Sequence, residues 1–284
     1  VNDGADVIVC VGYLYGASLA WAADQYPDVK FIAVDVTQGD IGTDAIPANC
    51  YCITFKEEQA GYLAGYAIAK DGKTKLGFLG GMAVPAVIRY GYGFVQGADA
   101  AAVEMGIADQ VVMEYAYGNQ FYGDSDITAY MDNWYQTLGV EVVFASGGGI
   151  YTSAAEAAAK VGGKLIGVDV DQSGILAAYG EDMTVTSAMK GLANTTQHMI
   201  DEVVKGNFAN YGGKIETLGL VSGDDPTANY VQIPMETTQW GDGFTQDDYK
   251  TLVKAMFDGT VTVSNDITAM PAVTITVNEY GNIK

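Results

Sequence analysis

The chain contains the short run KLGFLG (Lys75–Gly80), then the longer segment VIRYGYGFVQGADAAAVEMG (Val87–Gly106), then the run QVVMEYAY (Gln110–Tyr117). The two short runs are apolar and rich in residues typical of strands, whereas the segment between them is long and rich in alanine, which favours a helix. A strand, a helix and a second strand in this order are typical of a βαβ unit, in which the strands are parallel. This stretch predicts an α/β protein with a parallel sheet.

The same alternation extends the predicted fold in both directions. Strands are predicted over Asp6–Gly12, Lys30–Val36, Cys50–Phe55, Lys75–Gly80, Gln110–Tyr117, Val140–Ser146, Lys164–Asp169 and Met183–Thr186, and helices over Gly16–Tyr26, Glu57–Lys70, Val87–Gly106, Ser125–Leu138, Thr152–Val161 and Lys190–Lys205. Eight parallel strands would make one very large sheet, so the length predicts two lobes. The first boundary is expected near Phe55 and Lys56, where a strand runs into a helix start without a Gly or Pro turn.

The composition is that of a globular protein and excludes several kinds of partner. Of the 284 residues, 49% are apolar and 17% are charged, which is enough for a sizeable core. The formal net charge of −21 repels phosphate backbones and anionic lipid, so we expect neither nucleic acid nor a membrane surface as a direct partner. There is no run of about 18 apolar residues and no basic N-terminal head, so we expect no transmembrane span and no signal peptide in this chain.

The residues that catalysis or metal binding would need are scarce. The chain has one histidine (His198), one arginine (Arg89), and no nucleophile elbow, P-loop or HExxH motif, which argues against an enzyme. Cys10, Cys50 and Cys52 lie in apolar, strand-like runs, and we interpret them as buried core residues. One histidine cannot complete a zinc site with them. We therefore expect no catalytic residues, no metal and no cofactor.

Two motifs at the carboxyl ends of predicted strands are candidates for ligand binding. The loop Ser146–Gly149 offers backbone N–H groups to a ligand, or is a plain tight turn, and its spacing departs from the Gly-x-Gly-x-x-Gly dinucleotide motif. Asp169 and Asp171 lie at the carboxyl end of the next strand. A carboxylate there can accept hydrogen bonds from two neighbouring sugar hydroxyls, which suits ribose. We favour this role for Asp169, and a turn or helix cap for Asp171.

One lysine and two aromatic pairs complete the candidate residues. Lys190 opens a predicted helix, where the macrodipole disfavours a cation, so it is expected to donate to a sugar hydroxyl or a base acceptor unless it is simply solvated. Phe121 and Tyr122 are adjacent in a loop after a strand and are suited to stacking on a planar ligand. Tyr13 and Tyr15 form a similar loop after the first strand, although chance is an alternative for that pair in a chain with 19 tyrosines.

Several motifs together carry a resemblance to a known family. They are FKEEQAGYLAG (Phe55–Gly65), LGFLGG (Leu76–Gly81) with Pro85, GYGFVQG (Gly91–Gly97), GVDVDQ (Gly167–Gln172) and TSAMK (Thr186–Lys190). With these motifs in the family's order from Val1 to about Val263, the chain resembles the basic membrane protein (BMP) family of substrate-binding lipoproteins. It is similar to the purine nucleoside receptors of bacterial ABC transporters.

The resemblance implies a type I periplasmic-binding-protein fold, with two doubly wound α/β lobes, three hinge crossings and a ligand cleft between the lobes. It implies an N-terminal lobe of residues 1–56 and about 188–222, and a C-terminal lobe of residues 57–187 and about 223–284. It also implies an extracytoplasmic lipoprotein, anchored to the cell membrane, that binds a purine nucleoside such as inosine, guanosine or adenosine for an ABC permease.

The family's ligand contacts can be transferred to matching positions of this chain. The resemblance implies Asp169 and Lys190 for the ribose, Phe121 or Tyr122 for one face of the base, the Gly147–Gly148 backbone beside the ligand and, as a weaker candidate, Glu57 for base recognition. Tyr13, in the aromatic loop after the first strand, is a candidate from the other lobe on the residues alone.

One departure from the family and three alternatives accompany this prediction. The family's N-terminal Asp-Lys-Ser-Phe-Asn signature, which supplies the second stacking aromatic, has no counterpart here. We expect either that the first strands, the signal and the lipid anchor lie outside this chain, or that this lobe is built differently. The ligand could instead be another ribosylated or ribityl compound such as riboflavin. A nucleoside hydrolase using Asp169 and Asp171 with calcium is the enzyme alternative. A ligand-sensing regulator shares the fold, but no helix-turn-helix or basic stretch is present.

Overall fold

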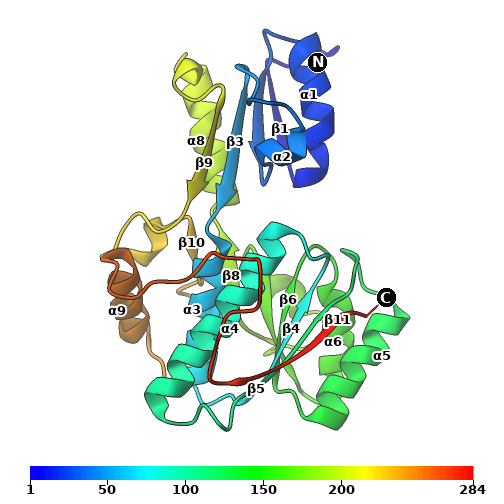
Figure 1. The fold of residues 1–284 in the computed structure, drawn as a ribbon, viewed down its shortest axis with the longest axis vertical. Helices are drawn as coiled ribbons and strands as arrows, with labels where there is room; N and C mark the ends of the chain where they lie inside the picture. The colour runs from blue at the N-terminus through cyan, green and yellow to red at the C-terminus, as the bar shows by residue number, and fades with distance from the viewer. Residues whose placement is uncertain (284) are drawn as a thin grey trace. The chain divides into compact units, whose positions relative to one another are not determined.

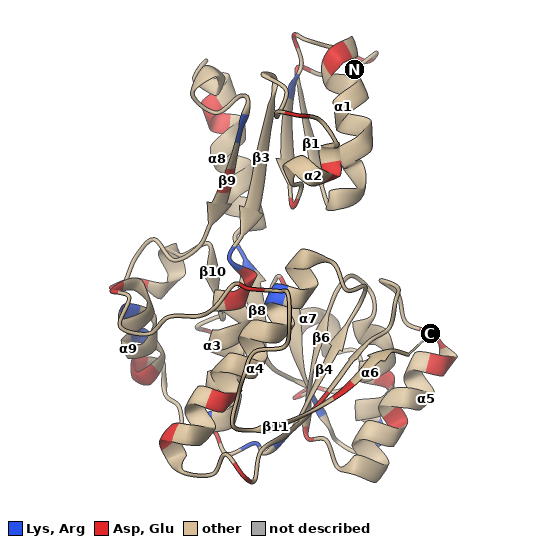
Figure 2. Cartoon of the chain, viewed as in Figure 1, with Lys and Arg blue, Asp and Glu red and all other residues tan. Residues whose placement is uncertain are grey.

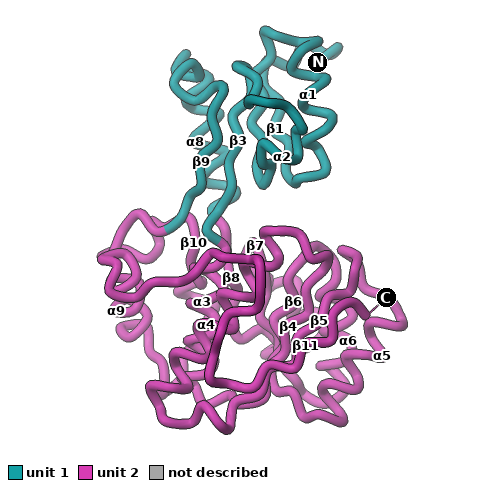
Figure 3. The backbone as a smooth tube through the Cα atoms, in the orientation of Figure 1, with its two compact units in different colours: residues 1–56, 191–219 teal, residues 57–190, 220–284 magenta. Residues whose placement is uncertain are grey.

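The computed structural model describes residues 1–283, and the chain divides into two compact units (Figure 1; Figure 3). Unit 1 comprises residues 1–56 and 191–219, and unit 2 comprises residues 57–190 and 220–284. The chain therefore passes from one unit to the other three times. Within the described residues, no helix combines the length and the hydropathy that crossing a membrane requires.

Unit 1 is a four-stranded parallel sheet with helices on both faces. Its strands, in spatial order, are β1 (Val7–Val11), β2 (Lys30–Val34), β3 (Cys50–Phe55) and β9 (Lys214–Leu218). Helix α1 (Gly16–Gln25) packs against one face, where it shares a core with Phe31 and Ala33, and α8 (Leu192–Val204) lies on the other side (Figure 1). The remaining elements are η1 (Tyr13–Tyr15), α2 (Gln38–Ile41) and η3 (Phe208–Asn210). The three cysteines are buried in this unit, as predicted.

Unit 2 is built on a seven-stranded sheet. Its strands, in spatial order, are β10 (Val231–Gln232), β8 (Thr184–Lys190), β7 (Lys164–Asp169), β6 (Val142–Ser146), β4 (Lys75–Gly80), β5 (Val112–Tyr117) and β11 (Thr276–Asn282). All neighbours are parallel except β10 and β8. The sheet is therefore a parallel α/β sheet with one antiparallel edge strand.

Helices cover both faces of this sheet (Figure 1). They are α3 (Glu57–Lys70), α4 (Pro85–Met105), α5 (Ser125–Asn133) with its π-helical continuation η2 (Trp134–Leu138), α6 (Tyr151–Ala159), α7 (Ser173–Leu176), η4 (Pro226–Ala228) and α9 (Gln246–Phe257). Leu79 and Ala145 belong to the core that α5 and α6 share. Phe144, one residue before Ala145, contacts Tyr90 and Phe94 of α4 instead, because successive side chains of a strand point to opposite faces.

The predicted α/β architecture with parallel sheets is confirmed. The strands Cys50–Phe55, Lys75–Gly80 and Lys164–Asp169 and the helix Glu57–Lys70 have the predicted bounds. Strands β9, β10 and β11 were not predicted. They are edge strands or short, partly exposed segments whose side chains give no clear apolar period.

The prediction that Lys190 opens a helix is wrong. Strand β8 continues through Lys190, and α8 begins only at Leu192. The strand is extended by its neighbours: β7 pairs with it as far as Met189, and Val231 of β10 pairs with Lys190. Lys190 therefore lies in unit 2, at the carboxyl end of a central strand, rather than in the N-terminal lobe to which the sequence boundaries assigned it.

Helices α3 and α4 of unit 2 are in close backbone contact through glycines. The glycines are Gly61 and Gly65 on α3, and Gly93 and Gly97 on α4. A Cβ on Gly93 would lie 2.1 Å from the Glu58 carbonyl oxygen, and one on Gly61 would lie 2.2 Å from the Tyr90 carbonyl oxygen. Because no side chain larger than hydrogen fits there, the contact fixes the beginning of α3 against the residues around Tyr90 on α4.

Candidate functional site

Strained backbone marks the carboxyl ends of three parallel strands. Asp169 at the end of β7, Asn119 after β5 and Asp35 after β2 have φ values of 66°, 57° and 56°, and they are the only non-glycine residues with positive φ in the described part of the chain. Such conformations are sparsely populated and concentrate at functional sites, and ligands of open α/β sheets bind at these strand ends. Asp35 and Asn119 were not predicted, although a polar residue directly after an apolar strand could have indicated both.

The Asp169 carboxylate is held through one of its two oxygens. Lys190 Nζ lies 3.2 Å from Oδ1 of Asp169, and the Tyr90 hydroxyl donates a hydrogen bond of 3.2 Å to the same oxygen. Oδ2 accepts no hydrogen bond from residues 1–283, and the side chain is 36% exposed. The carboxylate is therefore fixed in orientation and has an acceptor oxygen available to a ligand.

Lys190 connects Asp169 to a second, completely buried acid. Its side chain is 3% exposed, and its Nζ lies 3.8 Å from Oε1 of Glu57, which is 0% exposed. Oε2 of Glu57 accepts a hydrogen bond of 2.6 Å from Nε of Arg89. Arg89, Glu57, Lys190 and Asp169 thus form a charge network of two cations and two anions. Pairing of this kind offsets part of the cost of removing a carboxylate from water.

A second cluster joins the predicted aromatic loop to the glycine loop. The half-buried Phe121 ring lies against the backbones of Gly81 and Gly147, where an added Cβ would come within 2.5 and 2.9 Å of the ring. The Gly149 N–H donates to the Phe121 carbonyl oxygen at 2.7 Å. Gly147 has a φ of 133° and Gly148 a φ of 54°, which favour glycine. The structure thus brings Phe121 together with the glycine loop, whereas Tyr122 is 63% exposed.

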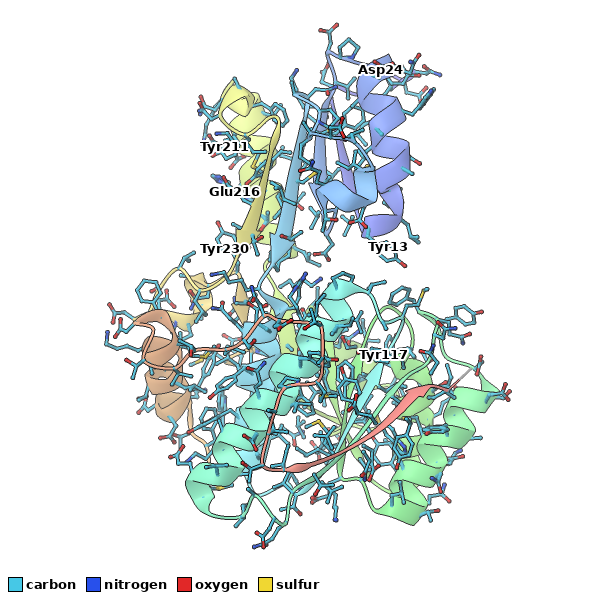
Figure 4. The ribbon with its side chains drawn as sticks, viewed as in Figure 1. Tyr13, Asp24, Tyr117, Tyr211, Glu216 and Tyr230 are labelled. Carbon is cyan, nitrogen blue, oxygen red and sulfur yellow. The ribbon has the colours of Figure 1, made fainter. Side chains whose placement is uncertain are left out.

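The other predicted residues have different surroundings. Tyr13 lies in unit 1, in the short helix η1 after β1 (Figure 4). Asp171 accepts hydrogen bonds from the Ser173 N–H and from the Thr237 hydroxyl, which confirms its interpretation as a turn residue. Across residues 1–283, no three or more His, Cys, Asp or Glu side chains are grouped so as to hold a metal ion.

The two units and their parallel α/β sheets define a type I periplasmic-binding-protein fold. The structure is similar to an ABC transporter solute-binding protein from Aeropyrum pernix K1, with a TM-score of 0.65 and 24% identity over 92% of this chain and 72% of that one. It is also similar to a transcriptional activator of the comK gene from Bacillus halodurans, with a TM-score of 0.63 and 18% identity over 90% of this chain and 78% of that one. These likenesses establish the fold.

The sequence identifies the family. Residues 1–224 match the family described as ABC transporter substrate-binding protein PnrA-like (Bmp). The chain is 30% identical over 225 residues to basic membrane protein B of Borreliella burgdorferi, covering 78% of this chain and 62% of that protein. The chain therefore belongs to the Bmp family of substrate-binding proteins, as the resemblance predicted. It spans about 62% of the length of this relative.

Proposed function

We propose that this chain is the solute-binding part of an extracytoplasmic receptor that serves an ABC importer, and that it binds a purine nucleoside. Membership of the PnrA-like family supports the receptor role. The geometry of the site supports a nucleoside as the ligand. The observation that carries it is the Asp169 carboxylate, which is fixed through Oδ1 and has Oδ2 available at a strand end.

This carboxylate is suited to a vicinal diol. The 2′- and 3′-hydroxyls of ribose donate in nearly the same direction, so one carboxylate can accept both, and hydrogen bonds to a charged acceptor are stronger than neutral ones. Lys190, whose Nζ contacts the same carboxylate, is a candidate donor to a ribose oxygen. The charges of the two cations and two anions in the network sum to zero. The network therefore offers no net positive charge to a phosphate, which favours a neutral nucleoside over a phosphorylated one.

The base is assigned to the aromatic and glycine cluster. Phe121 is held by the backbones of Gly81 and Gly147, so its ring is ordered before a ligand arrives and little entropy is lost on stacking. Glu57 is completely buried and held by Arg89, so its role is to position Lys190 rather than to recognise the base. Tyr13 stays a prediction.

Calorimetric titration of the purified chain with inosine, guanosine and adenosine, each beside its 2′,3′-dideoxy analogue, tests the proposal. The ribonucleosides are expected to bind more tightly than the dideoxy analogues. Asp169→Ala is expected to lower ribonucleoside affinity on the order of tenfold to several-hundredfold and to remove the discrimination. Asp171→Ala is the control, because that carboxylate is already used within the protein, and it should alter stability but not affinity.

Four results would contradict the proposal. Absence of binding by all three nucleosides would refute the nucleoside assignment, and tighter binding of riboflavin would move it to a ribityl ligand. Equal affinity for ribo and dideoxy ligands would refute the role of Asp169. Release of free base from inosine during incubation would indicate a hydrolase. Native mass spectrometry of the purified protein would identify a ligand that co-purifies.

A further inference from the structure

Two neighbouring residues of α4 each hold one acid of the charge network. Arg89 donates to Glu57 and Tyr90 donates to Asp169, and Lys190 lies between these two carboxylates. We propose that Arg89 and Tyr90 are positioning residues of the ligand site: together they keep Lys190 on Asp169 and keep the Asp169 Oδ2 atom turned towards the ligand. The inference rests on the proposed function, because it assigns the orientation of the residue that meets the diol.

Arg89 acts through the buried charge of Glu57. Its Nε is 2.6 Å from one Glu57 oxygen, whereas Lys190 Nζ is 3.8 Å from the other and only 3.2 Å from Asp169. Arg89 is therefore the closer of the two cations to Glu57, and Lys190 is closer to Asp169. Loss of Arg89 would leave a completely buried carboxylate without its nearest cation. Because charges attract strongly in a poorly solvated interior, Lys190 would then move towards Glu57 and away from Asp169.

Tyr90 acts through the orientation of Asp169. Its side chain is 2% exposed, its ring packs edge-on against Phe144 at 5.7 Å, and Lys190 Nζ lies over the ring at 5.6 Å from its centre. The backbone of Tyr90 is also fixed, because its carbonyl oxygen contacts Gly61 of α3. The hydroxyl therefore has a defined position, and its bond to Oδ1 determines which Asp169 oxygen remains for the ligand.

The test compares affinities for inosine and 2′,3′-dideoxyinosine by calorimetry. Tyr90→Phe removes a single oxygen, Arg89→Met removes the cation, and Arg89→Lys keeps it. Tyr90→Phe and Arg89→Met are expected to lower inosine affinity about 2- to 10-fold, the change that corresponds to one hydrogen bond of ordinary strength. Dideoxyinosine affinity should change less than about 2-fold, and Arg89→Lys should retain most of the discrimination. Tyr92→Phe, a tyrosine two residues further along α4, is the matched control and should bind as the wild type does.

A double-mutant cycle separates positioning from a general structural effect. If Tyr90 acts through Asp169, then Tyr90→Phe should have no further effect on inosine affinity in an Asp169→Ala background. Tyr90→Phe also keeps the inference testable if Arg89→Met fails to fold.

Different results would refute the positioning role of Arg89 and Tyr90 and the proposed binding of a nucleoside. Equal loss of inosine and dideoxyinosine affinity, additivity in the cycle, or wild-type discrimination in both Tyr90→Phe and Arg89→Met would overturn the positioning role while nucleoside binding stands. A wild-type chain that binds neither ligand, or binds both equally, would refute the proposed function and this inference with it.

Discussion

The glycine contact between α3 and α4 makes a strong prediction for Gly93→Ala. The new Cβ would lie 2.1 Å from the Glu58 carbonyl oxygen, against at least 3.4 Å for an ordinary contact. The clash is with backbone, so no side-chain rotation relieves it, and the cost is expected at the upper end of the overpacking range, about 3 kcal/mol. Replacing a helical glycine by alanine gains about 1 kcal/mol. The net expectation is a loss of about 2 kcal/mol in the free energy of unfolding.

Gly174→Ala is the matched control, because Gly174 also lies in a helix but an added Cβ there would meet nothing within 4 Å. That variant should gain up to about 1 kcal/mol. Urea unfolding followed by the fluorescence of the tryptophans measures both changes. A Gly93→Ala protein as stable as the wild type, or stabilised to the same extent as Gly174→Ala, would refute the close contact of the two helices.

Three further predictions concern the base, the pH dependence and the C-terminal segment. Phe121→Ala should weaken nucleoside binding roughly 5- to 150-fold, because base stacking contributes about 1–3 kcal/mol, and the exposed Tyr122→Ala should not; calorimetry that finds the reverse order would contradict the assignment. Burial raises the pKa of Tyr62 and of Tyr117 to about 12. Their contribution to stability is therefore complete below the unfolded-state pKa near 10 and is lost as the pH rises through 12, by up to about 1.4 kcal/mol per pH unit for each tyrosine; a Tyr62→Phe variant whose free energy of unfolding falls with pH as steeply as that of the wild type would contradict this. Tyr280→Phe should lower the free energy of unfolding by about 1.5–3 kcal/mol, because the Tyr280 hydroxyl donates a hydrogen bond to the buried Glu114 carboxylate; an unchanged urea midpoint would show that this contact contributes nothing.

Most of the central elements could be predicted because their signals are local. The strand Lys164–Asp169 and the helix Glu57–Lys70 have the bounds that their apolar patterns indicated. The elements that were missed depend on distant partners. Strand β11 forms only by pairing with β5, more than 150 residues earlier, and its Tyr280 donates to the buried Glu114 of that strand.

The sequence predicted individual residues of the candidate site but not that they contact one another. Asp169 could be found because an acid at the end of an apolar strand is a local feature of the sequence. The excess of acidic over basic residues, which are spread over the chain (Figure 2), follows from composition alone. Lys190 was found for the wrong reason, since it ends a strand and does not open a helix. Arg89 and Tyr90 carried no local signal.

The sequence by itself determined the α/β class, the excess of acidic residues, the buried cysteines and the family. These follow from periodicity, composition and motif spacing, which are properties of neighbouring residues. Only the tertiary structure decided that Glu57, Tyr90, Asp169 and Lys190 meet. Their contact depends on the order of β8 and β7 in the sheet and on a glycine contact that brings α3 against α4. The physical reason is that charges and hydrogen bonds act over a few ångströms in space, whereas a sequence pattern records distance along the chain.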